Sequence, residues 1–298
     1  MLWQDPRVVS VTPFIPPAFE VMQKNGHFLP TATDALYKNG LNIFHAVTDV
    51  SIERITYRVD DLHITGALLT PRHIKETSQP LLIYNRGGSG QFGILNIFVL
   101  ALLAEYAREG YIILASNYRG NDGSDGKDEF GGADVRDVVE LLDIGRTHPA
   151  WDGKNAFMYG HSRGAMMTFL AIKHGAALSA AAAVAGPTHC DDLLTERPDM
   201  INVYRRYIPQ YDENTDTVMR ERSAVHWVDA LNVPLLIVHG DVDDRVNISH
   251  AHALDAALTL AGKSHKTVIY PGGDHSLMRR YRNESMQEIK AWFARYST

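Results

Sequence analysis

The sequence has little of what would place the protein among disulfide-stapled, membrane-spanning or nucleic-acid-binding proteins. Cys190 is the only cysteine in 298 residues, so no internal disulfide can form and a reducing compartment is favoured. The longest apolar stretch, residues 94–103, is too short to cross a bilayer and is interrupted by Asn96. Lysine and arginine do not cluster with aromatic residues, and the net charge is −6. Neither a membrane nor a nucleic acid is therefore an expected partner.

Other special sites are also missing from the sequence. No group of histidine, cysteine and carboxylate residues has the spacing of metal ligands, so neither metal nor cofactor is predicted. No motif surrounds Cys190, which favours a packed thiol over a nucleophile. Residues 1–10 contain Trp3, Asp5 and Pro6 where a signal peptide would be basic and then apolar. The cytoplasm is therefore the expected location.

What is present is an alternation of short apolar runs and amphipathic stretches that begins near residue 52. Alternation of this kind predicts an α/β fold, with a mostly parallel central sheet and helices on both faces. A chain of this length is enough for one large domain of this class. Strands are expected at 81–84, 112–115, 156–159, 180–184, 234–238 and 266–269, and helices at 96–108, 133–146, 163–172, 251–261 and 286–296.

Two segments depart from this alternation. Residues 1–50 are irregular and rich in proline, which predicts an N-terminal appendage before a catalytic domain at 51–298. Residues 187–232 carry many charges and four tyrosine or tryptophan rings between two predicted strands. An insertion of this length is expected to be a lid or a substrate-binding element.

A glycine-flanked serine lies at the junction of a predicted strand and a predicted helix, in Gly160-His161-Ser162-Arg163-Gly164. This context is the one that a nucleophile elbow needs, because the sharp turn tolerates only small neighbours and exposes the hydroxyl at the strand's end. The helix N-terminus also favours the negative charge that develops during acyl transfer. Ser162 is therefore the candidate nucleophile.

An acidic group and a histidine follow two later strands. Asp241, Asp243 and Asp244 come after the strand at 234–238, and Asp274 and His275 after the strand at 266–269. Carboxyl ends of parallel strands share one edge of a sheet, so these groups should meet Ser162, in the chain order of α/β-hydrolases. A serine hydroxyl becomes a good nucleophile only when an imidazole takes its proton and a carboxylate orients that imidazole. Residues alone leave the choice of aspartate open.

The chain resembles the catalytic domain of the prolyl oligopeptidase family of serine peptidases from about residue 55 onwards. The matching stretches are 55–57, 66–71, 117–123, the serine elbow, 195–197, 222–224 and, most specifically, His239-Gly240-x-x-Asp243-x-Arg245-Val246. The resemblance implies that Asp243 is the acid and that Arg245 holds a substrate carbonyl, as a guanidinium can. A surface arginine paired with Asp241 or Asp244 is the alternative for Arg245. His161 and His239 are interpreted as structural.

The resemblance also implies where an oxyanion hole should lie. Two donors are needed: the backbone N–H of Arg163 is expected to supply one and the Gly87–Gly88 turn the other. Many relatives have tyrosine or histidine before this glycine pair, whereas this chain has Arg86. Its side chain is taken as a candidate substrate-binding group, with a structural role as the alternative.

Full-length members of the family carry a large N-terminal β-propeller, for which residues 1–50 are too short. Access is then expected to depend on that leader, on residues 187–232 or on a homo-oligomer. Pro187, Cys190 and Leu194 stand where proline-specific relatives have aromatic rings. A pocket for apolar or small side chains is therefore expected, to which Tyr204, Tyr207 or Trp227 could contribute unless they pack within the lid.

Three functions remain after these considerations. The favoured one is a serine peptidase that cleaves short peptides through an acyl-enzyme on Ser162. The alternative is a carboxylesterase that uses the same residues on small acyl esters, because one fold serves both reactions. A non-catalytic protein of the same fold is the third, and the presence of all three candidate groups disfavours it.

Overall fold

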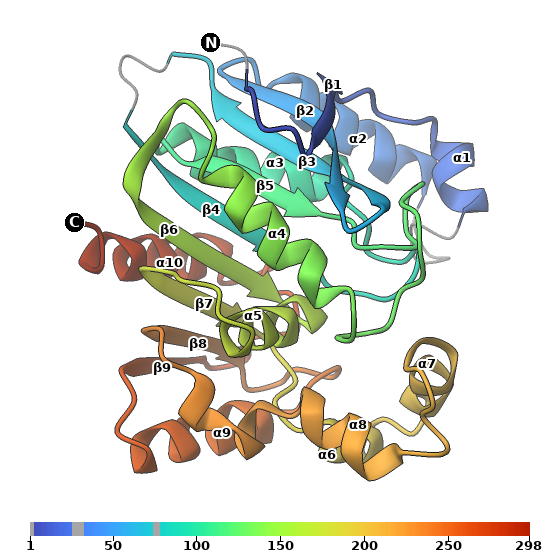
Figure 1. Ribbon diagram of the computed structural model, residues 1–298, viewed down its shortest axis with the longest axis vertical. Helices are drawn as coiled ribbons and strands as arrows, with labels where there is room; N and C mark the ends of the chain where they lie inside the picture. The colour runs from blue at the N-terminus through green and yellow to red at the C-terminus, as the bar shows by residue number, and fades with distance from the viewer. Residues whose placement is uncertain (1–2, 26–32, 74–77) are drawn as a thin grey trace. The chain divides into compact units, whose positions relative to one another are not determined.

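The computed structural model describes residues 3–25, 33–73 and 78–298, and divides into two compact units. The first unit comprises residues 1–128 and 136–155, and the second comprises residues 129–135 and 156–298. Parts of the predicted N-terminal appendage, residues 1–2 and 26–32, lie outside the described residues. Strands and helices of each unit are coloured by residue number in Figure 1.

In the first unit, an antiparallel set of strands leads into a parallel pair. β1 (Val8–Pro13), β2 (Val50–Val59) and β3 (Leu62–Pro71) pair antiparallel in sequence order, and β3 then pairs antiparallel with β5 (Ile112–Ser116). β4 (Gln79–Asn85) runs parallel to β5. The helices of this unit are α1 (Phe19–Lys24), α2 (Asp34–His45), α3 (Ile97–Arg108) and α4 (Val135–Gly145). α3 and α4 cover opposite faces of the strands (Figure 1).

The N-terminal appendage is more regular than its sequence suggests. Residues 8–13 form β1, which adds an edge strand to β2 with a register shift between Val8 and Ser10. α2 begins after Thr33, whose side chain accepts a hydrogen bond from the backbone N–H of Leu36 as a helix N-cap. β1 is a six-residue edge strand with one proline, Pro13, at its end, where a missing backbone N–H is tolerated.

All strands of the second unit are parallel. β6 (Trp151–His161) enters this unit from the first and pairs with β7 (Ala180–Val184), which pairs with β8 (Leu235–Gly240), and β8 pairs with β9 (His265–Tyr270). Every residue of β7 and β8 is buried, as strands covered on both faces require. α5 (Arg163–Lys173) and α10 (Arg282–Arg295) cover opposite faces, as Figure 1 shows. Each predicted strand from residue 81 onwards is present, within five residues of its expected ends.

Close approach of α5 to β7 fixes the position of the helix that follows the serine. Four consecutive alanines in β7 offer little side-chain bulk. A Cβ placed on Gly186 would lie 2.4 Å from the Ala165 Cβ, which is too close for any residue except glycine. The helix therefore begins directly above the end of β7, with no room for it to shift.

The insertion at 187–232 folds into short helices rather than a loop. They are α6 (Cys190–Glu196), α7 (Met200–Tyr207), α8 (Thr215–Arg222), η1 (Ala224–His226) and η2 (Val228–Ala230). α9 (Ser249–Leu260) packs against β8, β9 and the η1 turn. The Arg222 guanidinium, which is buried, ties the end of α8 to the carbonyl oxygens of Phe130 and Glu129 at 2.9 and 3.1 Å.

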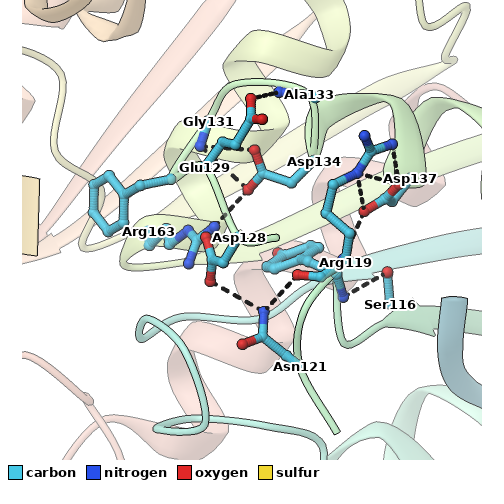
Figure 2. A network of polar contacts seen from close by, with 12 residues as sticks. Ser116, Arg119, Asn121, Asp128, Glu129, Gly131, Ala133, Asp134, Asp137 and Arg163 are labelled. Carbon is cyan, nitrogen blue, oxygen red and sulfur yellow. Dashed lines mark hydrogen bonds and ion pairs between the residues drawn. The ribbon is translucent and has the colours of Figure 1, made fainter. Parts of the chain in front are cut away.

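A buried ion pair joins the loop at 129–135 to the residue after the serine. Arg163 Nη2 contacts Asp134 Oδ2 at 2.5 Å, and both side chains are 3% exposed or less. The Asp134 carboxylate also accepts hydrogen bonds from the backbone N–H of Gly131 (Figure 2). The Arg163 guanidinium lies 4.7 Å from the centre of the Phe130 ring. Figure 2 also shows a second buried pair, Arg119 with Asp137, which belongs to the first unit.

We expect Asp134→Asn to lower the free energy of unfolding by about 3–5 kcal/mol, because it leaves the Arg163 charge buried without its counter-ion. Urea denaturation of the purified variant measures the effect. The double variant Asp134→Leu/Arg163→Met is the control, since removing both charges together should recover most of the loss. A single variant as stable as the wild type would contradict this account of the pair.

Candidate active site

Ser162 occupies a sharp turn between β6 and α5. Its φ of 56° and ψ of −126° are rarely adopted by residues other than glycine, and strain of this kind collects at functional sites. Its backbone N–H donates to the Val184 carbonyl at the end of β7, at 2.8 Å. A Cβ on Gly160 would lie 2.1 Å from the Gly164 carbonyl oxygen, so the turn closes only with glycine there. This is the elbow geometry that the sequence predicts.

Asp243 lies in the loop after β8 and is 8% exposed. Its Oδ1 accepts hydrogen bonds from the backbone N–H groups of Arg245 and Val246, at 2.8 and 2.9 Å. These two bonds close a tight turn that keeps the carboxylate facing inward. The orientation of the acid is therefore built into the local backbone.

His275, in the loop after β9, is bonded to this carboxylate. Its Nδ1 lies 2.8 Å from Asp243 Oδ2 and 3.0 Å from Oδ1. With Nδ1 occupied, Nε2 is the ring nitrogen left to exchange a proton with another group, as in a serine–histidine–aspartate triad.

The two loops are held together through their backbones. Val242 N–H donates to the Gly273 carbonyl at 3.1 Å, and Gly272 N–H donates to Asp241 Oδ1 at 2.6 Å. A Cβ on Gly240 would lie 2.2 Å from the Gly273 carbonyl oxygen. Glycine at the end of β8 is thus what lets the acid and histidine loops come into contact.

A further contact connects the histidine loop to the serine elbow. His161, the residue before Ser162, donates from Nε2 to the His275 carbonyl oxygen at 2.9 Å. The two imidazole rings meet edge to face with their centres 5.1 Å apart. The structure therefore brings Ser162, Asp243 and His275 to one edge of the parallel strands, as the chain order predicts.

The other aspartates near the site are engaged elsewhere. Asp241 caps the turn at Gly272, and Asp274 Oδ1 accepts from the backbone N–H groups of Ser276 and Leu277, at 3.2 and 2.8 Å. Asp244 is exposed. Among the described residues the carboxylate bonded to His275 is that of Asp243, the choice that the family resemblance implies.

Burial and hydrogen bonding act in opposite directions on the acid. Burial would raise the pKa of Asp243, but hydrogen bonds from His239 and His275 and from the backbone outweigh it and hold the pKa well below its ordinary value. Burial lowers the pKa of His161 to about 4, so that ring is uncharged at neutral pH. The site at neutral pH therefore contains an ionised carboxylate and no added cation from His161.

The candidate oxyanion donors lie in different parts of the fold. Arg163 is the first residue of α5, and its side chain is held away by Asp134, which leaves its backbone N–H at the helix start. Gly88 belongs to the first unit and has φ of 75°, and a Cβ there would lie 2.2 Å from the Phe92 carbonyl oxygen. Gly87 precedes it in the same tightly folded turn.

Arg86 supports that turn from within. The side chain is 0% exposed and stacks on the Tyr118 ring, 4.8 Å from its centre. Its guanidinium donates to four backbone carbonyl oxygens at 2.8–3.2 Å, those of Gly87, Gly90, Phe92 and Asn117. These contacts favour the structural alternative for Arg86 over substrate binding, because the N–H groups of its guanidinium are already bonded to the glycine turn.

Arg245, in contrast, extends an exposed side chain two residues after the acid. Within the described part of the chain its guanidinium forms no ion pair with Asp241 or Asp244. The alternative of a paired surface arginine is therefore not what the structure shows, and the guanidinium is available to a ligand.

The candidate specificity pocket is partly filled by the protein itself. Pro187 and Cys190 are buried and Leu194 is partly exposed. Burial raises the pKa of Cys190 to about 11, which makes the thiol inert, as the sequence predicts. Tyr204 is fully buried between Phe130 and Tyr211. Tyr204 is thus a packing residue of the insertion.

Trp227 and Tyr207 also have partners within the protein. The Trp227 ring lies 4.6 Å from Lys173 Nζ, and its Nε1 donates to the Arg220 carbonyl oxygen at 3.2 Å. The guanidinium of Arg206 lies over the Tyr207 ring at 5.3 Å. Both rings remain partly exposed, so they are the aromatic groups of the insertion that a ligand could still reach.

Asp134 is the residue of this site that sequence reasoning missed. It holds the side chain of Arg163, yet it precedes Ser162 by 28 positions and belongs to no motif. Its charged neighbours Arg136 and Asp137 gave the sequence no signal that would single it out. His239 was interpreted as structural, whereas its Nε2 lies 3.2 Å from Asp243 Oδ2.

The residues that the structure describes contain neither a metal-binding cluster nor a membrane-spanning helix. No group of three or more histidine, cysteine or carboxylate side chains is arranged to hold a metal ion. Nor does any helix in that part of the chain have the length and apolarity needed to span a bilayer.

Known proteins resemble this chain in sequence and in fold. A family model described as the prolyl oligopeptidase family matches residues 96–298. The uncharacterized peptidase YtmA of Bacillus subtilis is 26% identical over 246 residues, which are 82% of this chain and 93% of YtmA. The uncharacterized peptidase YuxL of the same organism is 28% identical over 81% of this chain and 38% of its own length.

Solved structures show the same fold at lower identity. The acylaminoacyl peptidase of Pyrococcus horikoshii superposes with a TM-score of 0.71 at 21% identity, over 86% of this chain and 42% of that one. A puromycin-hydrolyzing peptidase of Mycobacterium tuberculosis gives 0.68 at 17% identity, over 82% of this chain and 38% of its own. This chain thus spans nearly all of YtmA and less than half of the longer proteins.

The predicted fold class is confirmed by these superpositions, which place the parallel strands and their helices in the α/β-hydrolase architecture. The predicted family is confirmed by the match of its model to more than half of the chain. The chain belongs to the prolyl oligopeptidase family and is a serine-type peptidase.

Proposed function

We propose that Ser162, His275 and Asp243 are the catalytic triad of this peptidase and that it hydrolyses short peptides through an acyl-enzyme on Ser162. The observation that carries the proposal is the hydrogen bond from His275 Nδ1 to the buried Asp243 carboxylate. The loop of His275 also contacts the serine elbow, through the bond from His161 to the His275 carbonyl oxygen. The bond to Asp243 fixes the tautomer in which Nε2 can accept a proton.

The reaction follows from these positions. His275 Nε2 removes the Ser162 hydroxyl proton as the oxygen attacks the substrate carbonyl, and then gives that proton to the departing amine. The imidazolium formed in between is stabilised by ionised Asp243. Water, deprotonated by His275, next attacks the acyl-enzyme, and the proton returns to Ser162 as the carboxylic acid leaves.

Charge on the tetrahedral oxygen needs donors as well as a base. The Arg163 N–H at the start of α5 is the first, since the helix N-terminus and the fixed Asp134–Arg163 pair orient it. The Gly87–Gly88 turn, which belongs to the first unit, stays the expected source of a second donor. Arg86 supports this role indirectly, because it fixes the carbonyls of the same turn.

Short peptides are the substrate class that the exposed guanidinium favours. Arg245 can donate to a backbone carbonyl of a peptide, a group that a simple ester lacks beyond its own acyl oxygen. Among the similar proteins are ones named dipeptidyl-peptidase 5, acylaminoacyl peptidase and puromycin-hydrolyzing peptidase, which supports a peptidase reaction. A carboxylesterase would use the same triad without needing Arg245.

The compartment and the partners stay predictions. The single cysteine, buried as Cys190, fits the reducing cytoplasm. A small peptide is the predicted partner. A homo-oligomer is also predicted as an option, and a measurement of the protein's mass in solution tests it.

Ser162→Ala should abolish labelling by a fluorophosphonate probe and lower kcat by three or more orders of magnitude, because the triad acts as a unit. Probe fluorescence and turnover of aminoacyl-arylamides measure the two effects. Circular dichroism should match the wild type, since a smaller side chain fits the elbow. A wild-type protein that resists the probe would instead indicate a non-catalytic protein of this fold.

Arg245→Ala should raise KM on aminoacyl-arylamides and short peptides about three- to tenfold, because one charge-assisted hydrogen bond is lost. Its effect on short acyl esters should be smaller. Arg295→Ala, at an exposed arginine of α10, is the control and should change neither. Equal losses on peptides and esters would favour the carboxylesterase and contradict the peptide role of Arg245.

A further inference from the structure

A second histidine contacts the carboxylate of the proposed triad acid, Asp243. His239 is the fifth residue of β8 and is 1% exposed. Its Nε2 lies 2.8 Å from the Val246 carbonyl oxygen and 3.2 Å from Asp243 Oδ2. A carbonyl oxygen only accepts hydrogen bonds, so Nε2 carries the hydrogen and donates it.

Asp243 therefore stands among four donors. The backbone N–H groups of Arg245 and Val246 bond to Oδ1, and the side chains of His239 and His275 reach Oδ2. Two of the donors are backbone groups that any sequence could supply. Of the two side-chain donors, only His275 exchanges protons in the proposed reaction, which leaves His239 without an assigned role.

The surroundings of the other ring nitrogen of His239 indicate that the ring carries its hydrogen on Nε2 and not on Nδ1. Nδ1 is buried and has no hydrogen-bond partner among the described residues. A proton placed there would lose its hydration and gain no acceptor, which is costly. The ring is thus held with its hydrogen on the side of Asp243 and Val246.

We propose that His239 is a positioning residue of the hydrolysis, and that its Nε2–H holds Oδ2 of Asp243 and takes up part of the carboxylate charge that would otherwise act on His275. The inference rests on the proposed triad and adds a second imidazole to it. A carboxylate shared between two imidazole donors attracts each of them less than one that serves a single donor. His239 thereby limits how firmly Asp243 stabilises the imidazolium of His275.

The charged and titratable groups near Asp243 and His275 would otherwise influence the protonation of His275. His161 faces His275 from β6 and is uncharged at neutral pH, because burial lowers its pKa to about 4. Asp241 and Asp274 are bonded to backbone N–H groups of the histidine loop. Arg245 and Asp244 point into solvent, where salt screens them. Replacing His239 removes one contribution that lowers the pKa of His161, but burial is the largest cause, so that ring stays uncharged at neutral pH.

One further titratable group, His250 of α9, interacts electrostatically with His239 and lies beside Glu196 of α6. His250 is 1% exposed, and its Nδ1 accepts from the Thr188 N–H at 3.2 Å. Its Nε2 lies 3.3 Å from Glu196 Oε2. Burial lowers the pKa of His250, and the Glu196 charge opposes that shift only in part. His250 therefore adds no positive charge beside His239 at neutral pH.

Removing the His239 donor should have two consequences. Asp243 loses one restraint, so His275 is less well oriented and kcat falls. Oδ2 also interacts more strongly with the His275 imidazolium, so the base remains protonated to a higher pH. The acid limb of the kcat/KM profile should then shift upward, which a loss of packing alone would not produce.

The test compares His239→Met with His239→Gln in the full-length protein. The Gln amide can place its nitrogen near the position of Nε2 and donate to Asp243, whereas Met fills similar volume without a donor. We expect Met to lower kcat about five- to tenfold on aminoacyl-arylamides, with little change in KM, because Asp243 loses a donor that it shares with the Val246 carbonyl. The midpoint of the acid limb should rise by about half a pH unit, while Gln stays near the wild type in both.

Each result bears on the inference. A Met variant with the wild-type kcat and acid limb overturns it, as do Met and Gln variants that are equally impaired at an unchanged midpoint. If Met prevents folding, the same comparison is made with His239→Asn, which is too short to reach Asp243. Fluorophosphonate labelling of the wild-type protein keeps the two questions apart, because failure of that labelling would refute the triad itself.

Discussion

A buried carboxylate that stays ionised is the feature on which the rest of the site depends. Burial by itself would raise the pKa of Asp243, and a protonated acid would not stabilise the positive form of His275. Four donors prevent this, two from a tight backbone turn and two from imidazoles. The turn is local to the loop after β8, but the imidazoles come from β8 and from the loop after β9. The charge state of one side chain thus links separate segments of the fold.

Close backbone approaches hold those segments in place. Gly160, Gly186 and Gly240 each stand where a Cβ would come within 2.4 Å of another atom. They allow the elbow to close, α5 to sit against β7, and the acid loop to meet the histidine loop. Glycine has more conformational freedom to lose on folding than other residues, which lowers local stability. Here that loss is offset by the close contacts that form where the parallel strands end. The same logic applies to Arg86, whose buried guanidinium orders the glycine turn after β4.

Much of this could be predicted without coordinates, because the signals are local and repeat along the chain. Runs such as Leu235-Leu236-Ile237-Val238 predict buried parallel strands, and the strands were found close to their expected ends. The leader was harder to predict: β1 was missed, since it is a short edge strand and the prolines around it made the whole leader look irregular. The insertion was recognised by its length and charge, but its packing was not, because Tyr204 is buried through contacts with Phe130 and Tyr211.

By itself, the sequence determined the order of serine, acid and histidine and the edge of the sheet at which they lie, because strand polarity follows from the chain. The residues alone left the acid open, and the family resemblance implied Asp243. Only the tertiary structure decided which histidine shares this carboxylate and which arginine is buried. Arg86, Arg163 and Arg245 all carry the same charge and all lie near motif residues. The first is enclosed by backbone carbonyls, the second pairs with Asp134, and the third extends into solvent. The surroundings of the three arginines depend on segments that are distant along the chain. No local sequence pattern encodes which distant groups will surround a side chain.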